Sequence, residues 1–365
     1  MKEVPTIRTL AKLAGVSNAT VSLALRNHPR IRSEVRERIQ KIALEAGYKT
    51  DALVANLLAQ LRTKKTLSYQ STLGLLTIWE NPVHHKKTPT FLEWVAGCEE
   101  RAVSLGYGLD QFSLVDPPLT ADRLVKILHT RNIRGLLVIA SDLGDIIRAD
   151  LDPLWQYSAA IVMGVRPVHP LLSFTSNDQY DTATRATDEV LNLGYERPAL
   201  CIETYVDNWV EKRFSGGFFA RQNLLPRKNC IPKFEFDYKG EARFRAWMKK
   251  HRPDVIITLH VEVLAWVKAM GLRVPEDVGL VHLDRTLDMT DWAGMQQNNR
   301  HIGRAAIDML VGQLHRNEFG IPPFQKGMFI MSTWVAGPTV RRQEKATRKA
   351  PAVEISTDCT ASLAS

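Results

Sequence analysis

Apolar residues recur at helical spacing through the first fifty residues of the chain. This spacing predicts three short helices, over residues 7–14, 18–26 and 33–46. Gly15 suits the left-handed end of the first helix, and the hydroxyls of Thr6 and Ser17 suit the starts of the first and second helices. Two helices joined by a short turn and closed by a third form a helix-turn-helix, whose second helix fits the major groove of DNA.

From Thr72 onward the pattern changes to short apolar runs that alternate with amphipathic segments. The apolar runs lie at residues 73–78, 135–140, 159–164, 197–202, 254–259 and 278–283. Continuous apolar strands separated by helices are typical of parallel sheets that are buried under helices, so an α/β body is expected. At this length, two sheets in two lobes are expected rather than one.

These patterns divide the chain into domains. The predicted boundaries are 1–49 for the helix-turn-helix domain, 50–71 for a hinge helix and linker, 72–340 for the two-lobe domain and 341–365 for a disordered tail. Within the two-lobe domain, the first lobe is expected at residues 72–163 and 293–323, and the second at residues 164–292 and 324–340.

Positive charge is concentrated at the start of the chain. The net charge of the 365 residues is +9, and residues 1–65 alone hold 13 Lys and Arg against 5 Asp and Glu. Residues 66–340 are nearly neutral, with 30 basic against 31 acidic side chains. A basic module on a neutral body is typical of a protein that binds a polyanion through that module.

Several classes of protein are disfavoured by the sequence. It has no apolar stretch long enough for a membrane span and no secretory signal at its start, so a cytoplasmic location is expected. The four cysteines, at positions 98, 201, 230 and 359, lack metal-binding or disulfide-framework spacing. The chain also lacks the GxGxxG, GxxxxGK[ST], HExxH and GxSxG motifs of common enzyme classes, so neither catalysis nor a metal or other cofactor is expected.

The residues Ala14 to Ser22, AGVSNATVS, contain the AGVS-x-x-TVS pattern. The chain resembles the lactose/galactose-repressor (LacI/GalR) family of bacterial regulators in this pattern. The resemblance implies that Asn18, Ala19 and Leu23 read bases, although many members have Arg at the position of Leu23. It further implies phosphate contacts by a set of short hydroxyl side chains, namely Thr6, Ser17, Thr20 and Ser22.

The family has a hinge helix after this domain, which folds on DNA and inserts a leucine into the minor groove. Asn56 and Leu57 match the DNA-contacting positions of that helix, but Thr50 and Asp51 replace the usual Pro and Asn. A helix over residues 52–62 that is permanently folded in a dimer seam is therefore the alternative. The resemblance implies a homodimer on a pseudo-palindromic operator.

The body carries the run VPEDVGL at residues 274–280 and is similar to the family's ligand-sensing domain, itself built like periplasmic sugar-binding proteins. A Trp-Ala-Gly segment at 292–294 and the Trp-Val-x-Gly-Pro run at 334–338 resemble a branch associated with Verrucomicrobia-type bacteria. The implied effector-binding residues are Trp79, Trp209, Arg213, His260, Asp284 and Gln297. His260 departs from the Asn-Asp pair that is common there, Trp79 and Trp209 could equally be packing residues, and Asp284 could be a capping or inter-lobe salt-bridge residue.

These features together predict a non-enzymatic, nucleoid-associated transcriptional regulator, with repression as the expected mode. A small molecule between the lobes, a sugar or sugar derivative, is expected to modulate its operator affinity. The alternative is a regulator or architectural DNA-binding protein without an effector.

Overall fold

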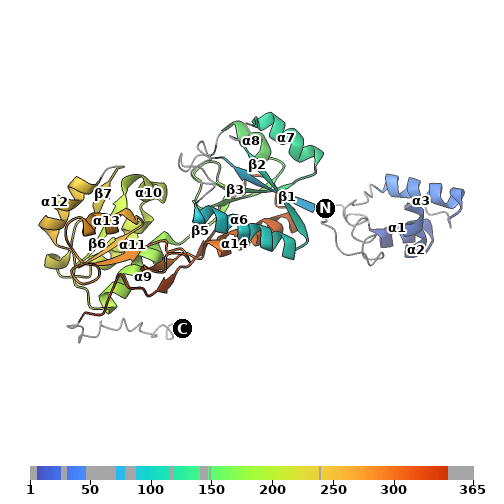
Figure 1. Cartoon of the computed structure of the whole chain (residues 1–365). Coiled ribbons are helices and arrows are strands. Elements are labelled where there is room, and N and C mark those ends of the chain that lie inside the picture. Colours follow the sequence, from blue (N-terminus) through green and yellow to red (C-terminus); the bar gives the residue numbers. More distant parts are fainter. Residues whose placement is uncertain are drawn as a thin grey trace, which may run out of the picture. The chain divides into compact units, whose positions relative to one another are not determined.

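The computed structural model describes residues 6–25, 31–46, 71–78, 88–114, 119–139, 147, 149–237 and 240–343. The chain forms two compact units, Met1–Ser68 and Tyr69–Ser365 (Figure 1). No helix among these described residues is long and apolar enough to cross a membrane.

The first unit is a three-helix domain. Its helices are α1 (Ile7–Ala14), α2 (Asn18–Leu25) and α3 (Ser33–Glu45), which confirms the predicted all-α helix-turn-helix. Leu10, Val21, Ala24 and Ile39 are fully buried and close a small core between the three helices. Gly15 adopts φ +65° at the end of α1, a backbone conformation in which the absence of a Cβ removes the steric cost.

The second unit contains two six-stranded sheets, which confirms the predicted two-lobe α/β architecture. The first sheet has the strand order β11-β5-β4-β3-β1-β2 and is parallel throughout. Its strands are β1 (Ser71–Thr77), β2 (Tyr107–Ser113), β3 (Gly135–Ile139), β4 (Ala159–Met163), β5 (Ser173–Asn177) and β11 (Gly327–Ile330). Its helices are α6 (Pro89–Ser104), α7 (Ala121–Thr130), the 3-10 helix η1 (Ala149–Leu151), α8 (Asp152–Trp155) and α14 (Asn299–His315).

The second sheet has the order β12-β10-β9-β8-β6-β7, in which only β12 runs antiparallel to its neighbour. Its strands are β6 (Pro198–Glu203), β7 (Phe234–Phe236), β8 (Val255–Thr258), β9 (Gly279–His282), β10 (Ala293–Gln296) and β12 (Thr333–Val335). Its helices are α9 (Gln179–Asn192), α10 (Thr204–Trp209), α11 (Arg213–Gln222), the 3-10 helix η2 (Arg227–Asn229), α12 (Glu241–His251) and α13 (Glu262–Lys268).

Each sheet is covered on both faces. In the first lobe, α6 and α14 pack on one face and α7 and α8 on the other. In the second lobe, α9 and α11 cover one face and α12 and α13 the other. The helices α6 and α14 approach closely because Gly97 and Gly303 lie at their contact: a Cβ on Gly97 would come 2.0 Å from the Arg300 carbonyl oxygen. The chain crosses between the lobes three times, after β5, β10 and β11.

These crossings move the lobe boundaries away from the predicted ones. The strand β5 belongs to the first sheet, not to a second lobe beginning at residue 164, and β11 also belongs to the first sheet. The strand β10, predicted in the first lobe, pairs with β9 and belongs to the second. The prediction failed because β5 (Ser-Phe-Thr-Ser-Asn) is polar in sequence although all five of its residues are buried, so no apolar run marks it.

Candidate functional site: a DNA-binding face and a ligand cleft

One face of α2 packs against the helical core, and the opposite face is exposed. Val21 and Ala24 are buried in the helical core, and this fixes the rotation of the helix. Asn18 and Ala19 are exposed in its first turn, and Leu23 is half-buried but takes no part in the core cluster. The residues predicted to read bases therefore lie on the side of α2 that faces away from the core.

The hydroxyls predicted to contact phosphate also shape the helix starts. The Oγ1 atom of Thr6 accepts a hydrogen bond from the Thr9 backbone N–H at 3.2 Å and completes a capping box. The Oγ atom of Ser17 accepts from the Thr20 N–H at 3.1 Å and lies 2.9 Å from the Thr20 Oγ1. These exposed helix N-termini present backbone N–H groups and a partial positive charge, which suit a phosphate.

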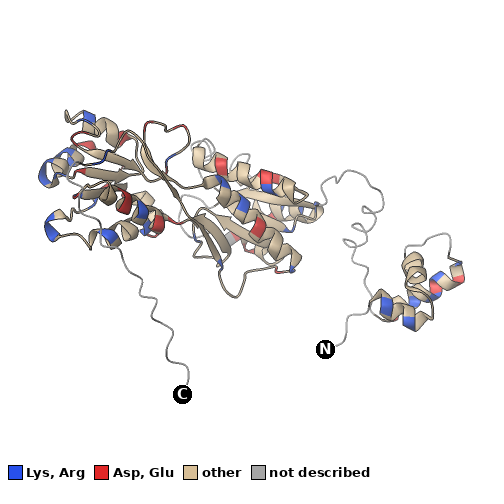
Figure 2. Cartoon of the chain, turned by 90° about the horizontal axis from the view of Figure 1, so that it is seen from below, with Lys and Arg blue, Asp and Glu red and all other residues tan. Residues whose placement is uncertain are grey.

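Two residues missed by the sequence analysis join α3 to the other helices. Arg38 donates to the Ala14 carbonyl at 3.2 Å, and Gln40 donates to the Ala24 carbonyl at 3.3 Å. They satisfy carbonyls at the ends of α1 and α2. Within the described helices of this unit, lysines and arginines lie on α1 and α3 and none lies on α2 (Figure 2). The predicted hinge residues Asn56 and Leu57 lie outside the described residues.

A cavity of about 260 Å³ lies between the two lobes of the second unit. Its wall comes from residues that follow the carboxyl ends of strands in both sheets, where ligands of open parallel sheets bind. The lining residues are Thr88, Thr90, Phe91, Trp94, Gly164, Asn177, Gln179, Tyr205, Val206, Trp209, Val210, Phe214, Leu259, Asp284 and Gln297.

A polar network joins the lobes at Asp284. Its carboxylate accepts hydrogen bonds from the Thr90 hydroxyl at 2.9 Å and from the Asn299 side-chain amide at 3.1 Å. The Oδ1 atom of Asn299 in turn accepts from the Trp94 Nε1 at 3.2 Å and from the Asn177 Nδ2 at 3.1 Å. The network links the start of α6, the end of β5, the start of α14 and the loop after β9.

Burial shifts the pKa values of Asp284 and His282 in this network. It raises the pKa of Asp284 to about 6, against the smaller lowering effect of the Thr90 and Asn299 hydrogen bonds. It lowers the pKa of His282 to about 4, so this imidazole is neutral at pH 7. The Nδ1 atom of His282 accepts from the Asp284 backbone N–H at 3.2 Å, which fixes the loop that carries the carboxylate.

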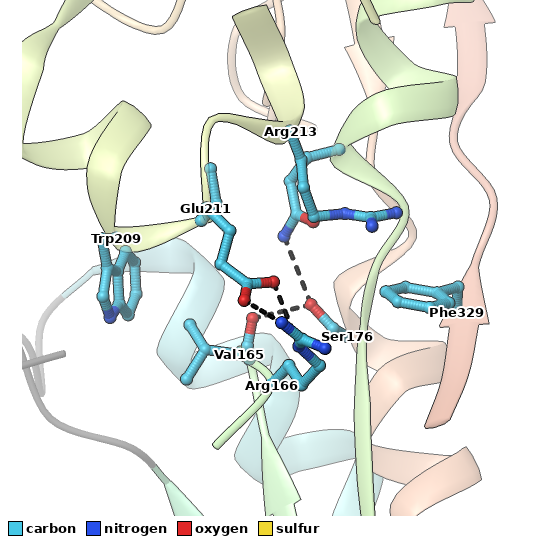
Figure 3. Close-up of a pocket in the computed structure, with 10 residues that line it drawn as sticks. Val165, Arg166, Ser176, Trp209, Glu211, Arg213 and Phe329 are labelled. Carbon is cyan, nitrogen blue, oxygen red and sulfur yellow. Dashed lines mark hydrogen bonds and ion pairs between the residues drawn. The ribbon is translucent and has the colours of Figure 1, made fainter. Parts of the chain in front are cut away.

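A smaller pocket adjoins the cavity and holds two arginines (Figure 3). Arg213 donates to the Asp178 carboxylate at 2.7 Å, and its guanidinium lies 4.4 Å from the centre of the Phe329 ring. Arg166, from the loop after β4, forms a two-pronged ion pair with Glu211 of the second lobe. This ion pair joins the two lobes at the edge of the cleft.

The structure brings together part of the predicted effector set. Trp209, Asp284 and Gln297 line the cavity, and Gln297 uses its Nε2 to donate to the Leu283 carbonyl at 2.8 Å. Arg213 lines the smaller pocket instead. His260 lines neither: its Nε2 accepts from the Glu203 N–H at 3.2 Å. Trp79 lies outside the described residues.

Most of the cavity wall was not predicted from the sequence. The missed wall residues include the aromatic side chains Phe91, Trp94, Tyr205 and Phe214 and the amides Asn177 and Gln179. The sequence analysis also missed Asn299, which donates to Asp284. The polar strand Ser-Phe-Thr-Ser-Asn (173–177) was the available signal, because a polar segment between two apolar cores needs internal partners.

Comparison with known proteins agrees with both units. Residues 6–51 match the model for bacterial regulatory proteins of the lacI family, and residues 187–325 match the model for a periplasmic binding protein-like domain. The chain carries a LacI-family DNA-binding domain and a periplasmic-binding-protein-like domain.

Curated proteins similar to this chain are transcriptional regulators. The NTD biosynthesis operon regulator NtdR of Bacillus subtilis is 26% identical over 296 residues, which cover 78% of this chain and 84% of the relative. The transcriptional repressor PurR of Aliivibrio salmonicida is 22% identical over 325 residues, which cover 85% and 92% of the two chains.

Solved structures share the fold. The lac repressor dimer bound to operator and the anti-inducer ONPF superposes with a TM-score of 0.55 at 18% identity, covering 93% of this chain and all of that one. The complex of the regulator CelR with cellobiose has the same TM-score and identity and covers 92% and 99%. A LacI-family regulator from Enterococcus faecium with bound ribose superposes at a TM-score of 0.55 and 14% identity, covering 75% and 100%.

Proposed function

We propose that this protein is a transcriptional repressor that binds a specific DNA operator and changes its DNA affinity when a small molecule occupies the cleft. The observation that carries the proposal is the joining of a LacI-family DNA-binding domain to a two-lobe domain with a cavity at its strand ends. A coupling of roughly 1–3 kcal/mol between the two sites would make a useful switch.

Asn18, Ala19 and Leu23 read the bases, and Thr6, Ser17, Thr20 and Ser22 contact phosphates. Support comes from the exposed first turn of α2 and from the capped helix starts. Leu23 can only contact apolar groups such as a thymine methyl, so base readout rests mainly on the Asn18 amide. Asn56 and Leu57 add contacts in the minor groove.

The protein acts as a cytoplasmic, nucleoid-associated homodimer on a pseudo-palindromic operator. Two-fold symmetry places two α2 helices on equivalent half-sites. The assignment to a Verrucomicrobia-type branch is a further prediction from the sequence.

The effector is a sugar or sugar derivative that contacts Trp209, Asp284 and Gln297, with Arg213 in the adjoining pocket. The contact expected from Trp79, which lies outside the described residues, stays a prediction from the sequence. Carboxylates and aromatic rings are suited to the hydroxyls and faces of a sugar ring. The known structures with cellobiose and ribose support this class of ligand.

A regulator or architectural protein without an effector is the second candidate. It is favoured by His260, which bonds to the Glu203 backbone rather than lining the cavity, and by Arg213, which is engaged with Asp178. Under this hypothesis the cleft is a structural remnant.

Thermal melting of the full-length protein in the presence of a sugar library distinguishes the two. A ligand at 100 times its Kd stabilises the folded state by roughly 2.7 kcal/mol, which gives a measurable rise in Tm. The proposal expects at least one such ligand, and the same ligand should change the affinity for operator DNA. No stabilisation by any sugar would favour the second candidate.

A further inference from the structure

The charged groups around the cleft are unevenly paired. Arg166 is paired with Glu211, and Arg213 is paired with Asp178 at 2.7 Å. Asp284 has no ion pair within the part of the chain that the structure describes. Among the described residues that line the larger cavity, Asp284 is also the one that carries a charge. The cavity therefore holds a negative charge that lacks a cation.

The partners of Asp284 leave capacity for a ligand. Both of its hydrogen-bond donors, the Thr90 hydroxyl and the Asn299 amide, are neutral. A carboxylate offers about four lone-pair positions, so each oxygen can accept a further donor. Asp284 is partly buried. A partly buried carboxylate without a counter-charge is unfavourable, and a cation placed against it would reduce that cost.

Aromatic rings surround the same space. Phe91 and Trp94 come from α6, Tyr205 and Trp209 from α10, and Phe214 from α11. The face of an aromatic ring attracts a cation, most strongly where water is excluded. Aromatic rings together with one carboxylate are the side-chain set that recognises an organic ammonium group.

Two buried polar atoms at the cavity lack partners among the described residues. Gln179 is 4% exposed, and its Nε2 donates to the Ser176 hydroxyl at 3.2 Å, whereas its Oε1 accepts no hydrogen bond from the part of the chain that the structure describes. The Nε1–H of Trp209 likewise has no acceptor within those residues. Because buried polar groups are normally paired, a ligand is expected to supply a donor to Gln179 and an acceptor to Trp209. A hydroxyl group provides both.

We propose that the cleft takes a small hydroxylated ring that carries a protonated amine, the chemistry of an amino sugar, with the ammonium group against Asp284. This inference rests on the proposed function and narrows its ligand class. A neutral sugar would cover the Asp284 carboxylate without supplying a counter-charge, and an anionic ligand would add a second negative charge to the cavity.

The test compares ligands that differ only in the amine. Full-length protein is titrated at pH 7 with glucose, with the three glucose analogues that carry an amine at C2, C3 or C6, and with N-acetylglucosamine, and Tm and Kd are measured. We expect at least one amine to bind ten-fold or more tightly than glucose, and N-acetylglucosamine to bind no more tightly than glucose. In Asp284→Asn the preference for the amine should disappear. Asp188→Asn, which removes a partly exposed carboxylate of α9 that is paired with Arg221 away from the cavity lining, is the control and should keep the preference.

Three results would overturn the inference: glucose that binds as tightly as every amine, an amine preference that survives in Asp284→Asn, or no stabilisation by any amine. N-acetylglucosamine has no protonated amine, so comparing it with the amines on the native protein tests the role of the charge. The test therefore holds even if Asp284→Asn fails to fold. If a neutral sugar binds tightly and alters operator affinity, the inference of an amine-bearing ligand is refuted. The proposed function as a ligand-controlled regulator would still stand. If the proposed ligand control itself is wrong, the protein should bind DNA normally and none of the tested ligands should change its affinity for DNA.

Discussion

The two units differ in the range of sequence over which their functional surfaces are assembled. In the DNA-binding unit, the hydrogen bonds that shape the exposed helix starts join residues three apart, as in Thr6–Thr9 and Ser17–Thr20. In the two-lobe unit, several bonds that shape the cleft join residues far apart in the sequence, such as Thr90 and Asp284, which are 194 positions apart. A local surface depends on one small core, whereas the cleft depends on how two lobes are held together.

The largest effect should come from the small core of the first unit. Leu10 is fully buried among three short helices, so Leu10→Ala should destabilise this unit by roughly 2–5 kcal/mol and abolish operator binding. The melting of the second unit, followed by calorimetry, should not change. Leu13→Ala on the same helix is the control, because Leu13 is 61% exposed. A fall in the melting temperature of both units would show that they do not fold independently.

Base reading by α2 gives the next largest effect. Asn18→Ala should weaken operator binding by about 1–3 kcal/mol, since an exposed amide in the first turn of α2 is suited to a two-pronged contact with adenine. Affinity for random DNA and the salt dependence of binding should stay unchanged, because no phosphate contact is removed. Equal losses on operator and random DNA, measured by fluorescence anisotropy, would contradict the assignment.

The partly buried charge of Asp284 should make the stability of the second unit depend on pH. Its pKa is raised to about 6 in the folded protein, so above pH 6 the folded state carries a cost that the unfolded chain does not. Asp284→Asn, which cannot ionise, should therefore be more stable than the native protein by roughly 1–3 kcal/mol at pH 7.5. The difference should shrink as the pH falls from about 6 to 4 and vanish below about pH 4, where the carboxyl is protonated in both the folded and the unfolded state. Thermal melts that show the same difference at both pH values would exclude this explanation.

The smallest effect should come from the ion pair between the lobes. Arg166 and Glu211 are partly exposed, so Arg166→Ala should cost less than about 1 kcal/mol and change ligand affinity only a few-fold, with less effect at high salt. Arg185→Ala removes a comparably exposed pair with Asp181 inside α9 and should leave ligand affinity unchanged. Identical titration curves for the two variants would show that the inter-lobe pair has no special role.

The contrast between local and distant contacts also explains what the sequence could predict. The helices of the first unit were predicted to within one residue, because Gly15, Thr6 and Ser17 act on neighbouring residues. The six apolar strands were predicted for the same reason, because the apolar residues of each strand themselves indicate that it is buried.

Contacts between residues far apart in the sequence could not be predicted from local sequence patterns. The buried strand β5 is polar, and its Asn177 finds its partners in residues 120 and 122 positions away. Asn299 occupies the centre of the cleft network, yet nothing in its immediate sequence sets it apart from Asn298. Asp284 was found only through the family resemblance, and its lack of a charged partner became visible only when both lobes were assembled.

The most direct test of the proposed regulator is the selection of genomic DNA fragments by the purified full-length protein at moderate salt, followed by sequencing. A DNA-reading face built on Asn18 and its neighbours predicts recovery of a few fragments that share one pseudo-palindromic site, and loss of that site with Asn18→Ala. Diffuse recovery across the genome, unchanged by Asn18→Ala, would contradict sequence-specific regulation and indicate an architectural DNA-binding protein.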